Sequence, residues 1–557
     1  MIMLIAKAKD KTFWDKVRTS EAYAPFRDEL LEMWTEFGGR EVPACRYSEF
    51  IIYDKTGSRK EYERSYFLRR RQLNTSALLS LIYPDEDKYL NYLLDVIWAV
   101  LDEYVWVLPA HMPSFKENVV EHIDLFAAET AFTLSEIEYL LGDRLPELIH
   151  SRIRAEVDRR VIQAYRKNTY WWDTSTNNWA AVCLCGVIGA VLYQKPELLD
   201  ELLPRIRSTV SCFLSGFPDD GICLEGFGYW HYGFGLYTCL ADLLYDYSNG
   251  SIDLFDYPKI RRIAGYADKM FLDKNTTVSF SDGSTTGRYH IGLLHYLKKK
   301  YPDDVTIPPR EFSYSNDGCG RWCMHLRAIL WFDEDLAYEK PHTSRTDYLE
   351  GAGWLIKVTN GYSFAAKGGT NDEPHNHNDL GAFLVVKDGK QLLTDPGAGT
   401  YDRAYFSSRR YEDFRASSRS HCVPIINGME QVAGKSHTAT TSYENGVFTV
   451  DFEKGYDIPK LISLKRTFSF TDSSVRLCDV FEYDGTPESF VERFVSTVKP
   501  KFTGDGIVLS SLTLHPEDDA VADVTVTETE YAGVKYYCID FKLISESRSF
   551  ELEISAE

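Results

Sequence analysis

The spacing of apolar residues changes once along this chain, and the change limits the folds that it can adopt. Up to about residue 340, apolar residues recur three and four positions apart, as on one face of a helix; after Pro84 they stand at Leu90, Leu93, Leu94, Ile97 and Leu101. From about Tyr348 they alternate with polar residues, as in strands buried on one face. The sequence therefore predicts an all-α domain followed by an antiparallel β domain.

Further helices of ordinary length are predicted at 119–132, 134–141, 152–165, 180–193, 198–213, 235–247 and 261–272. Short breaks of Pro, Gly, Asp or Asn separate them, as in a series of helical hairpins. Two strand hairpins are predicted, with turns at Asp388-Gly389 and Asn445-Gly446, because both dipeptides favour tight turns. Since residues 326–332 still have a helical pattern, we place the domains at 1–340 and 341–557.

Composition and charge exclude several classes of protein. The 557 residues include 62 Lys and Arg against 83 Asp and Glu, a formal charge of −21, which disfavours general nucleic-acid binding. No uncharged apolar stretch of about 18 residues is present, so we expect no membrane partner. The apolar run at residues 1–6 is too short for a secretory signal, and the 11 cysteines have no repeated spacing. We therefore expect a cytoplasmic protein with free thiols.

Two adjacent asparagines, Asn177 and Asn178, stand just before the apolar helix that begins at Ala180. One asparagine at a helix start is explained as an N-cap. The second is left without that explanation, and its side-chain amide would suit donation to a carboxylate without adding negative charge.

The stretch 219–237 is rich in glycine and aromatic residues. Its middle reads Glu225-Gly226-Phe-Gly-Tyr229-Trp230-His231-Tyr232. Glycine permits close backbone approach, and aromatic rings stack on sugars. A crowded turn between helices has the same composition, so both interpretations stay open.

A third stretch, 368–381, places His375 and His377 two residues apart, where both side chains face the same way on an extended segment. Asp395 and His421 follow later in the chain. Two histidines and one aspartate suit zinc, with manganese as the alternative. The loose spacing leaves ordinary structural histidines as the competing explanation.

An arginine cluster adjoins this stretch in the sequence. Guanidinium groups hold carboxylates and sulfates bidentately, so an anionic ligand is one interpretation, and a solvated surface diluted by acidic residues is the other. The cluster comprises Arg403, Arg409, Arg410, Arg415 and Arg419, and we expect Arg415 and Arg419 to contact the ligand.

Taken together, these motifs resemble those of the heparinase II/III-like polysaccharide lyases, a family of heparinases, alginate lyases and broad glycosaminoglycan lyases. The resemblance covers nearly the whole chain and rests on Asn177-Asn178-Trp179, Glu225-Gly226 with residues 229–233, residues 374–383, Asp395-Pro-Gly397 and His421. It implies an incomplete (α/α) toroid followed by an antiparallel β-sandwich. It also implies a carbon–oxygen lyase that cleaves uronate-containing polysaccharides or oligosaccharides, such as hyaluronan, chondroitin sulfate, heparan sulfate or alginate, by β-elimination.

The resemblance assigns roles to single residues. Asn178 would neutralise the uronate carboxylate, with Asn177 as the alternative. Tyr232 would be the catalytic phenol, with Tyr229 as the alternative, and His375 the catalytic imidazole. The substrate would also contact residues around these, namely Asn177, Glu225, Tyr229, Trp230, His231, Arg415 and Arg419. The metal ligands would be His377, Asp395 and His421, in a structural site.

These residue types suit the elimination chemistry. Donors aimed at the uronate carboxylate lower the barrier to removing the C5 proton, because they stabilise the enolate that develops. A tyrosine serves as base or acid if nearby cations or donors depress its pKa from about 10. The rival enzyme is a glycoside hydrolase on a similar toroid, which needs a carboxylate pair, for which Asp219, Asp220 and Glu225 are candidates. A metal-dependent hydrolase and a non-catalytic carbohydrate-binding protein are further alternatives.

Overall fold

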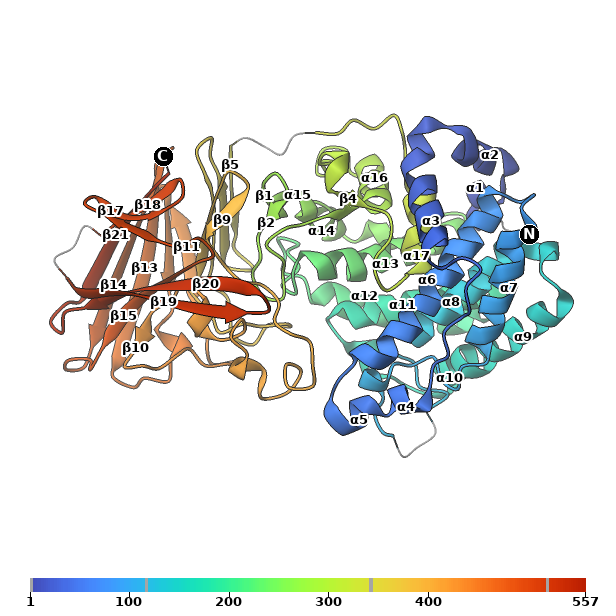
Figure 1. Ribbon diagram of the computed structural model, residues 1–557, viewed down its shortest axis with the longest axis horizontal. Coiled ribbons are helices and arrows are strands. Elements are labelled where there is room, and N and C mark those ends of the chain that lie inside the picture. Colours follow the sequence, from blue (N-terminus) through green and yellow to red (C-terminus); the bar gives the residue numbers. More distant parts are fainter. Residues whose placement is uncertain (1–3, 116–118, 340–343, 517–519, 557) are drawn as a thin grey trace.

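The computed structural model describes residues 4–115, 119–339, 344–516 and 520–556. The helices and the long strands form two parts that lie side by side along the longest axis of the molecule (Figure 1). The last long helix, α17, ends at Trp331, and the first strand of the strand-rich part, β5, begins at Arg345. The predicted boundary at residues 340 and 341 lies outside the described residues.

The helical part is an incomplete (α/α) toroid, as predicted. Its longer helices are α2 (Lys11–Thr19), α3 (Ala24–Phe37), α6 (Lys60–Ile82), α7 (Asp87–Leu101), α8 (Leu125–Leu141), α9 (Glu147–Val157), α11 (Asn178–Gln194), α12 (Leu199–Ser215), α13 (Phe227–Tyr247), α16 (Ile291–Lys300) and α17 (Trp322–Trp331). Shorter ones are α1 (Ala6–Lys9), α4 (Tyr47–Phe50), α5 (Ile52–Thr56), α10 (Gln163–Lys167), α14 (Ile260–Ala264) and α15 (Tyr266–Met270). Among the described helices, none is both long and apolar enough to cross a membrane.

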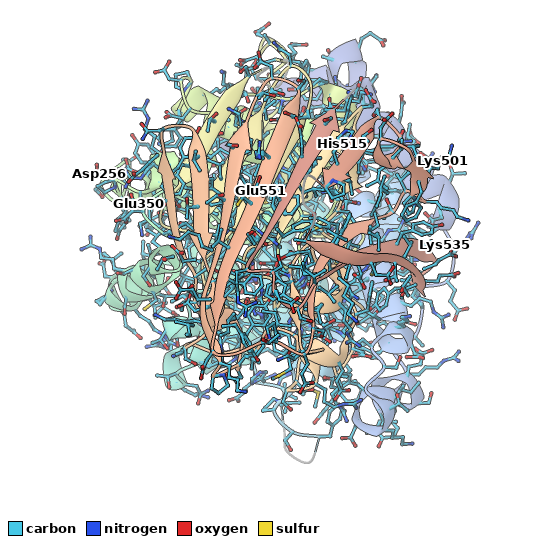
Figure 2. The ribbon with its side chains drawn as sticks, turned by 90° about the vertical axis from the view of Figure 1, so that its left-hand side faces the viewer. Asp256, Glu350, Lys501, His515, Lys535 and Glu551 are labelled. Atoms are coloured by element: carbon cyan, nitrogen blue, oxygen red, sulfur yellow. The ribbon has the colours of Figure 1, made fainter. Side chains whose placement is uncertain are left out.

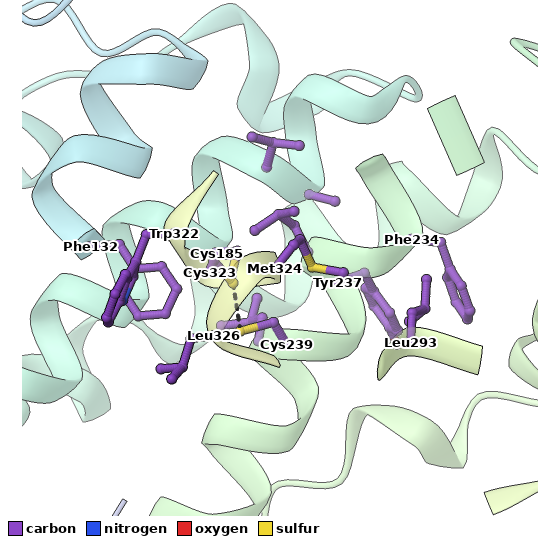
Figure 3. Packing of buried hydrophobic residues seen from close by; sticks show 14 of the residues in the cluster. Phe132, Cys185, Phe234, Tyr237, Cys239, Leu293, Trp322, Cys323, Met324 and Leu326 are labelled. Carbon is purple, nitrogen blue, oxygen red and sulfur yellow. Dashed lines mark hydrogen bonds between the residues drawn. The ribbon is translucent and has the colours of Figure 1, made fainter. Parts of the chain in front are cut away.

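Helix α11 lies inside the helical part, packed between α8 and α13. It is apolar on all sides and almost fully buried, as expected for a central helix. Gly186 lets α8 come close, because a Cβ at this position would lie 2.5 Å from the carbonyl carbon of Ala128. The packing continues around the thiols of Cys185, Cys239 and Cys323 (Figure 3), and all eleven cysteines are free. This close packing brings the first residues of α11 next to α8 and α13.

The predicted helix at 261–272 was wrong: α14 and α15 divide it, and residues 271–273 form a strand. Two other differences in helix boundaries bear on the site. Residues 119–132 and 134–141 were predicted as separate helices, but α8 runs unbroken from Leu125, where the Asp124 side chain accepts a hydrogen bond from the Ala127 N–H at 2.7 Å. Helix α13 begins at Phe227, eight residues before the predicted start at 235. Tyr229 and Tyr232 therefore lie on the first turns of a helix, three residues apart on one face.

Within the described residues, the strand-rich part contains three antiparallel sheets. One has the order β5-β6-β7-β8-β9, the second β10-β15-β20-β19, and the third β11-β12-β13-β14-β21-β18-β17-β16. The third sheet faces the viewer in Figure 2, with Glu551 on its strand β21. The bounds are β5 (Arg345–Leu349), β6 (Trp354–Val358), β7 (Ser363–Lys367), β8 (Phe383–Lys387), β9 (Lys390–Leu393), β10 (Ile425–Ile426), β11 (Thr440–Glu444), β12 (Val447–Asp451), β13 (Leu461–Phe470), β14 (Ser474–Tyr483), β15 (Phe490–Ser496), β16 (Lys501–Thr503), β17 (Gly506–Leu509), β18 (Leu512–Pro516), β19 (Val521–Tyr531), β20 (Val534–Leu543) and β21 (Ser549–Ala556).

Both predicted hairpins are present. Strands β8 and β9 pair across Asp388 and Gly389, and β11 and β12 pair across Asn445 and Gly446. All four turn residues have positive φ, between 52° and 82°, as a tight hairpin turn requires. The described residues of the helical half also form the short strands β1 (Phe271–Asp273), β2 (Thr276–Thr277), β3 (Tyr289–His290) and β4 (Ser313–Tyr314).

The five-stranded sheet joins the two parts. Alternate residues of a strand face opposite sides, and in β8 Leu384 and Val386 belong to the core of the helical part, while Phe383 and Val385 belong to the core of the β-sandwich. The loop between β7 and β8, residues 368–382, carries the predicted histidine motif. Because both faces of the sheet are buried, this loop has a fixed position relative to the helices.

Candidate active site

A pocket of about 770 Å³ lies between the helical part and the strand-rich part. Its walls include Asn178, Tyr229 and Tyr232 from the helices, and His375 and Tyr401 from the other part. The residues that the sequence motifs single out in separate halves of the chain therefore face one cavity.

The two asparagines have different roles. The Asn177 side chain accepts a hydrogen bond from the Trp179 N–H at 3.1 Å and is the N-cap of α11. Asn178 is 3% exposed, and its Nδ2 donates to Glu225 Oε2 at 2.7 Å, while its backbone N–H donates to Oε1 at 3.1 Å. The second Nδ2 hydrogen of Asn178 is not needed for this contact, so a ligand in the pocket can accept it.

Glu225 links Asn178 to the histidine loop. Its Oε2 lies 3.6 Å from His375 Nε2, and burial raises the pKa of the Glu225 carboxyl above its usual range, partly opposed by His375 and Asn178. Gly226, at φ 109°, starts α13 directly after it. This conformation favours glycine, and it turns the Glu225 side chain back toward α11.

The two candidate tyrosines have different environments. The Tyr229 ring stacks on His375, with centroids 4.2 Å apart, and its hydroxyl lies 2.7 Å from that of Tyr401. The Tyr232 hydroxyl donates to Glu129 on α8, and the Arg321 guanidinium lies over the Tyr232 ring, 3.9 Å from its centroid.

The groups around Tyr232 do not depress the pKa of its phenol. Burial, followed by the negative charge of Glu129, raises the pKa of Tyr232 well above its ordinary value, and Arg321 opposes the rise only in part. A free phenolate is therefore costly at this position.

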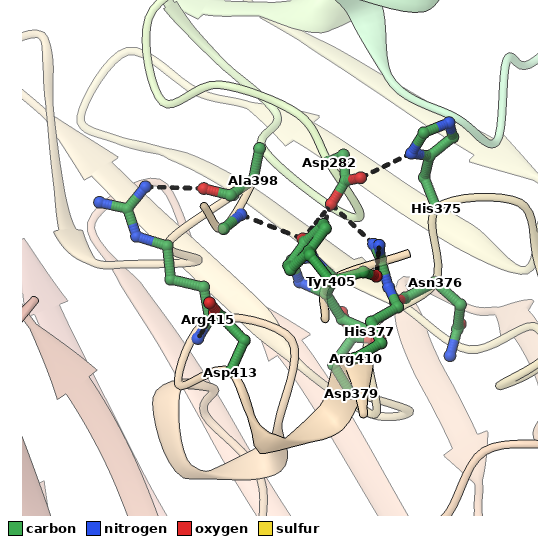
Figure 4. Close-up of polar contacts among 12 residues, drawn as sticks. Asp282, His375, Asn376, His377, Asp379, Ala398, Tyr405, Arg410, Asp413 and Arg415 are labelled. Carbon is green, nitrogen blue, oxygen red and sulfur yellow. Dashed lines mark hydrogen bonds and ion pairs between the residues drawn. The ribbon is translucent and has the colours of Figure 1, made fainter. Parts of the chain in front are cut away.

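Asp282 connects the histidine loop to the helical part (Figure 4). His375 Nδ1–H donates to its Oδ2 at 2.6 Å and His377 Nε2–H to its Oδ1 at 3.1 Å. Arg410 Nη2 donates to Oδ1 at 2.8 Å, the Tyr401 hydroxyl to Oδ2 at 2.9 Å, and the Tyr405 hydroxyl to Oδ1. Burial alone would raise the pKa of Asp282, but the hydrogen bonds from the two histidines hold it well below its usual range. The carboxylate therefore stays ionised and orients both imidazoles.

Three glycines bring the Asp282 loop into place. A Cβ at Gly226 would lie 3.3 Å from the backbone of Gly283, and a Cβ at Gly397 would lie 2.3 Å from the Gly283 carbonyl oxygen. The Ala398 N–H donates to the same oxygen at 3.1 Å. The loop that holds Asp282 thus lies between one glycine of each part, with no room for a Cβ at Gly397.

His375 has a left-handed backbone conformation, with φ at 60°. Histidine is among the non-glycine residues that adopt this region more often than most. Since Nδ1–H is donated to Asp282, neutral His375 keeps a lone pair on Nε2, on the side of Glu225 and the pocket. That nitrogen is placed to take a proton.

The predicted metal ligands His377, Asp395 and His421 converge, with ligand atoms within 4.8 Å of one another, and all three are buried. His377 donates Nε2–H to Asp282, and His421 donates Nε2–H to the Arg415 carbonyl at 2.9 Å. The Nδ1 atoms face the cluster: that of His377 has no partner within the described structure, and that of His421 donates to Asp395 Oδ2 at 3.0 Å. Two inward-facing imidazole nitrogens beside a carboxylate, with each second nitrogen bonded outward, fit a divalent metal that takes the place of the His421 Nδ1 proton.

The comparisons with known proteins concern the family and the fold of the chain. Residues 342–534 match the family model for the heparinase II/III-like C-terminal region. This stretch is similar to the C-terminal domain of that family. The family resemblance predicted from the motifs is confirmed. A search of curated proteins finds no match.

Solved structures match the whole chain at low identity. Heparinase III gives a TM-score of 0.61 at 13% identity, covering 99% of this chain and 91% of that one. A heparan sulfate lyase HepC mutant from Pedobacter heparinus gives 0.57 at 12% identity, covering 97% and 90%. The Streptomyces coelicolor A3 chondroitin AC lyase in complex with chondroitin sulphate gives 0.52 at 11% identity, covering 98% and 82%. At such identities the likeness establishes the fold, a toroid followed by a heparinase II/III-like domain.

Five predicted substrate contacts are absent from the described lining of the main pocket, namely Glu225, Trp230, His231, Arg415 and Arg419. Trp230 is fully buried and its Nε1 donates to the Ile263 carbonyl at 2.8 Å, so its ring is part of the core and has no face for a sugar. His231 is buried beside a second cavity of about 240 Å³, and burial lowers its pKa to about 3.

Arg415 and Arg419 hold the heparinase II/III-like domain together and do not line the main pocket. Arg415 donates to the Ala398 carbonyl at 2.7 Å and lies over the Tyr531 ring, on the side of Asp282 away from His375 (Figure 4). Arg419 pairs with Glu430 at 3.3 Å. The arginine of the cluster that does line the pocket is Arg410, which is bonded to Asp282.

Sequence reasoning missed Glu129, Asp282 and Arg321. Helix α8 carries Glu129, Glu136 and Glu138 among mostly apolar residues, and these glutamates were a usable signal, because a buried carboxylate needs a partner. Asp282 stands in a Ser-Asp-Gly-Ser turn that looks ordinary, and Arg321 just precedes α17. Nothing local in the sequence connects either of them to the histidine motif.

Proposed function

We propose that this chain is a polysaccharide lyase that cleaves uronate-containing polysaccharides or oligosaccharides by β-elimination, with hyaluronan, chondroitin sulfate, heparan sulfate and alginate as candidate substrates. One observation carries the proposal: a phenol and an imidazole from different parts of the molecule, Tyr232 and His375, line the same pocket as the Asn178 amide. The fold shared with heparinase III and chondroitin AC lyase supports it.

In this proposal Asn178 donates its second Nδ2 hydrogen to the uronate carboxylate. That contact reduces the negative charge on the carboxylate and lets the charge that develops at C5 spread into it. For one C5 epimer, Tyr232 takes the proton and returns it to the leaving oxygen. For the other, His375 Nε2 takes the proton and Tyr232 is the acid.

A divalent metal, zinc by preference and manganese as the alternative, would be held by His377, Asp395 and His421. When bound, it would supply a cross-link that fixes the 368–382 loop. Asp282 already orients His375 and His377 from the helical side, so the histidine loop is held from both sides.

The glycoside hydrolase alternative has less support. Asp219 pairs with Lys259 at 3.5 Å, and Asp220 accepts a hydrogen bond from the Ala352 N–H at 3.2 Å. None of Asp219, Asp220 and Glu225 is among the described residues that line the pocket, so these carboxylates do not form a pair across it.

The test is an absorbance assay with purified protein. The chain is incubated in turn with hyaluronan, chondroitin sulfate, heparan sulfate, heparin and alginate, and the absorbance of the conjugated double bond that elimination creates is followed. We expect a rise with at least one polymer, and its loss in Tyr232→Phe and His375→Ala. Folded protein that gives a flat trace on all five would refute the proposal, and release of reducing ends without absorbance would indicate hydrolysis.

A further inference from the structure

The proton of the Tyr232 hydroxyl has a single acceptor in the described structure, and it is not in the pocket. The hydroxyl donates to Glu129 Oε1 on α8. The Glu129 side chain is 12% exposed and is absent from the described lining of the pocket, whereas Tyr232 is part of that lining. The phenol oxygen thus stands between the cavity and a carboxylate behind it.

Arg321 holds the tyrosine and the glutamate together. Its guanidinium covers the Tyr232 ring, and its Nε lies 3.5 Å from Glu129 Oε1. A further ion pair with Asp317 fixes the guanidinium from the other side. One cation therefore contacts both members of the pair, and their geometry is set before any substrate binds.

The electrostatics of the pair disfavour a free phenolate. Burial and the charge of Glu129 raise the pKa of Tyr232, while burial raises the pKa of Glu129 to about 7, against the opposing effect of Arg321. A phenol that must first lose its proton would be a poor base here. A phenol that passes its proton on while it gains another avoids that cost.

Given the lyase activity proposed above, we propose that Glu129 is the proton acceptor behind Tyr232 and that the phenol relays protons between the sugar and this carboxylate. As the C5–H bond breaks, the phenol oxygen gains the C5 proton, the phenol proton moves to Glu129 Oε1, and the electron pair of the C5–H bond enters the enolate. As the C4–O bond breaks, that pair forms the C4–C5 double bond and Tyr232 protonates the leaving oxygen. Glu129 then returns its proton to the phenol.

The test compares Glu129→Gln with wild type on whichever polymer the wild type cleaves. Glutamine keeps the size and an acceptor oxygen but cannot take a proton. We expect kcat to fall by about 100-fold or more, the scale of general base catalysis, with KM within about twofold. The matched control is Glu138→Gln, a buried glutamate on the same helix that pairs with His150 and Arg154; it should keep wild-type kcat.

The pH profile separates proton transfer from a structural role. The groups that face Glu129 are Arg321, Asp317 and Cys319 before α17, Tyr232 on α13, Asp124 at the start of α8, and Cys183 on α11. Because the acceptor must be ionised, wild-type kcat should rise with pH through the ionisation of Glu129, near 7, and Glu129→Gln should lose this rise.

The outcomes distinguish the relay from the lyase activity. If the wild type is active and Glu129→Gln keeps the wild-type kcat, the relay is overturned but the proposed lyase activity is not. A reduced kcat with an unchanged pH profile, or a change in KM alone, would also overturn it, since a structural contact has those effects. An inactive wild type would overturn both.

Discussion

Replacing Asn178 by alanine tests the central charge-neutralising contact. If its amide is the donor to the uronate carboxylate, its loss should lower kcat by about 100- to 1,000-fold, the cost of removing one such donor. The effect should fall on kcat more than on KM, because the donor matters most when charge develops on the carboxylate. The readout is steady-state kinetics in the absorbance assay, on the polymer that the wild type cleaves.

The same variant should also change stability, by an amount that follows from the structure. Glu225 would lose the 2.7 Å bond from Asn178 Nδ2 and keep the 3.1 Å bond from the backbone N–H. A buried carboxylate that loses one of two donors costs about 1–3 kcal/mol. Chemical denaturation should therefore show a small loss of unfolding free energy, too small to explain the fall in kcat.

Asn177→Ala is the matched control. It removes the N-cap bond to Trp179 and should cost about 1 kcal/mol of stability, as caps of this type do, with kcat within about threefold of wild type. An Asn178→Ala variant that keeps wild-type kcat would refute the assignment of the neutralising amide to Asn178. The refutation would be stronger if Asn177→Ala lowered kcat instead.

Three further predictions concern the metal site and the packing around it. Elemental analysis should show that His421→Ala has lost a bound divalent metal, and the variant should unfold at a lower temperature than wild type. Wild-type protein that contains no stoichiometric metal when purified without chelators would contradict the site. Gly397→Ala would place a Cβ 2.3 Å from the Gly283 carbonyl oxygen and so displace the Asp282 loop. We therefore expect kcat to fall at least about tenfold. Wild-type kinetics in this variant would argue that the loop does not support the site. Arg466 donates to the buried Asp479 carboxylate at 2.6 Å and 2.9 Å, so Arg466→Ala leaves that carboxylate without its partner. We expect chemical denaturation to show a loss of about 3–5 kcal/mol of unfolding free energy. Adding Asp479→Asn should restore part of this loss, and strictly additive losses from the two substitutions would contradict the pairing.

The features that could be predicted from the sequence are those that depend on residues close together in the chain. The change of apolar period predicted the order of the two parts, and the Asp388-Gly389 turn predicted its hairpin. His375 and His377 stand in one loop, so their joint approach to Asp282 needs only that loop to be placed.

The residues that sequence reasoning missed depend on contacts between distant segments. Asp282 is 93 residues from His375, and Glu129 is 103 residues from Tyr232, so no spacing rule connects them. Trp230 was predicted to contact the sugar because its neighbours Tyr229 and Tyr232 suggested an aromatic surface for the ligand. On a helix, however, this residue between them points into the core.

The position of the five-stranded sheet explains why an active site can be divided between the two parts. A loop on a loosely tethered domain would not hold His375 in the pocket that Tyr232 lines to the tolerance that proton transfer requires. Here Leu384 and Val386 of β8 are buried against the helices, while Phe383 and Val385 are buried in the sandwich. Separating the two parts would expose one face of this sheet, so the energy that fixes the catalytic geometry is ordinary apolar burial. It follows that small polar substitutions on the helix-facing side of β8 should reduce kcat at temperatures where the protein is still folded.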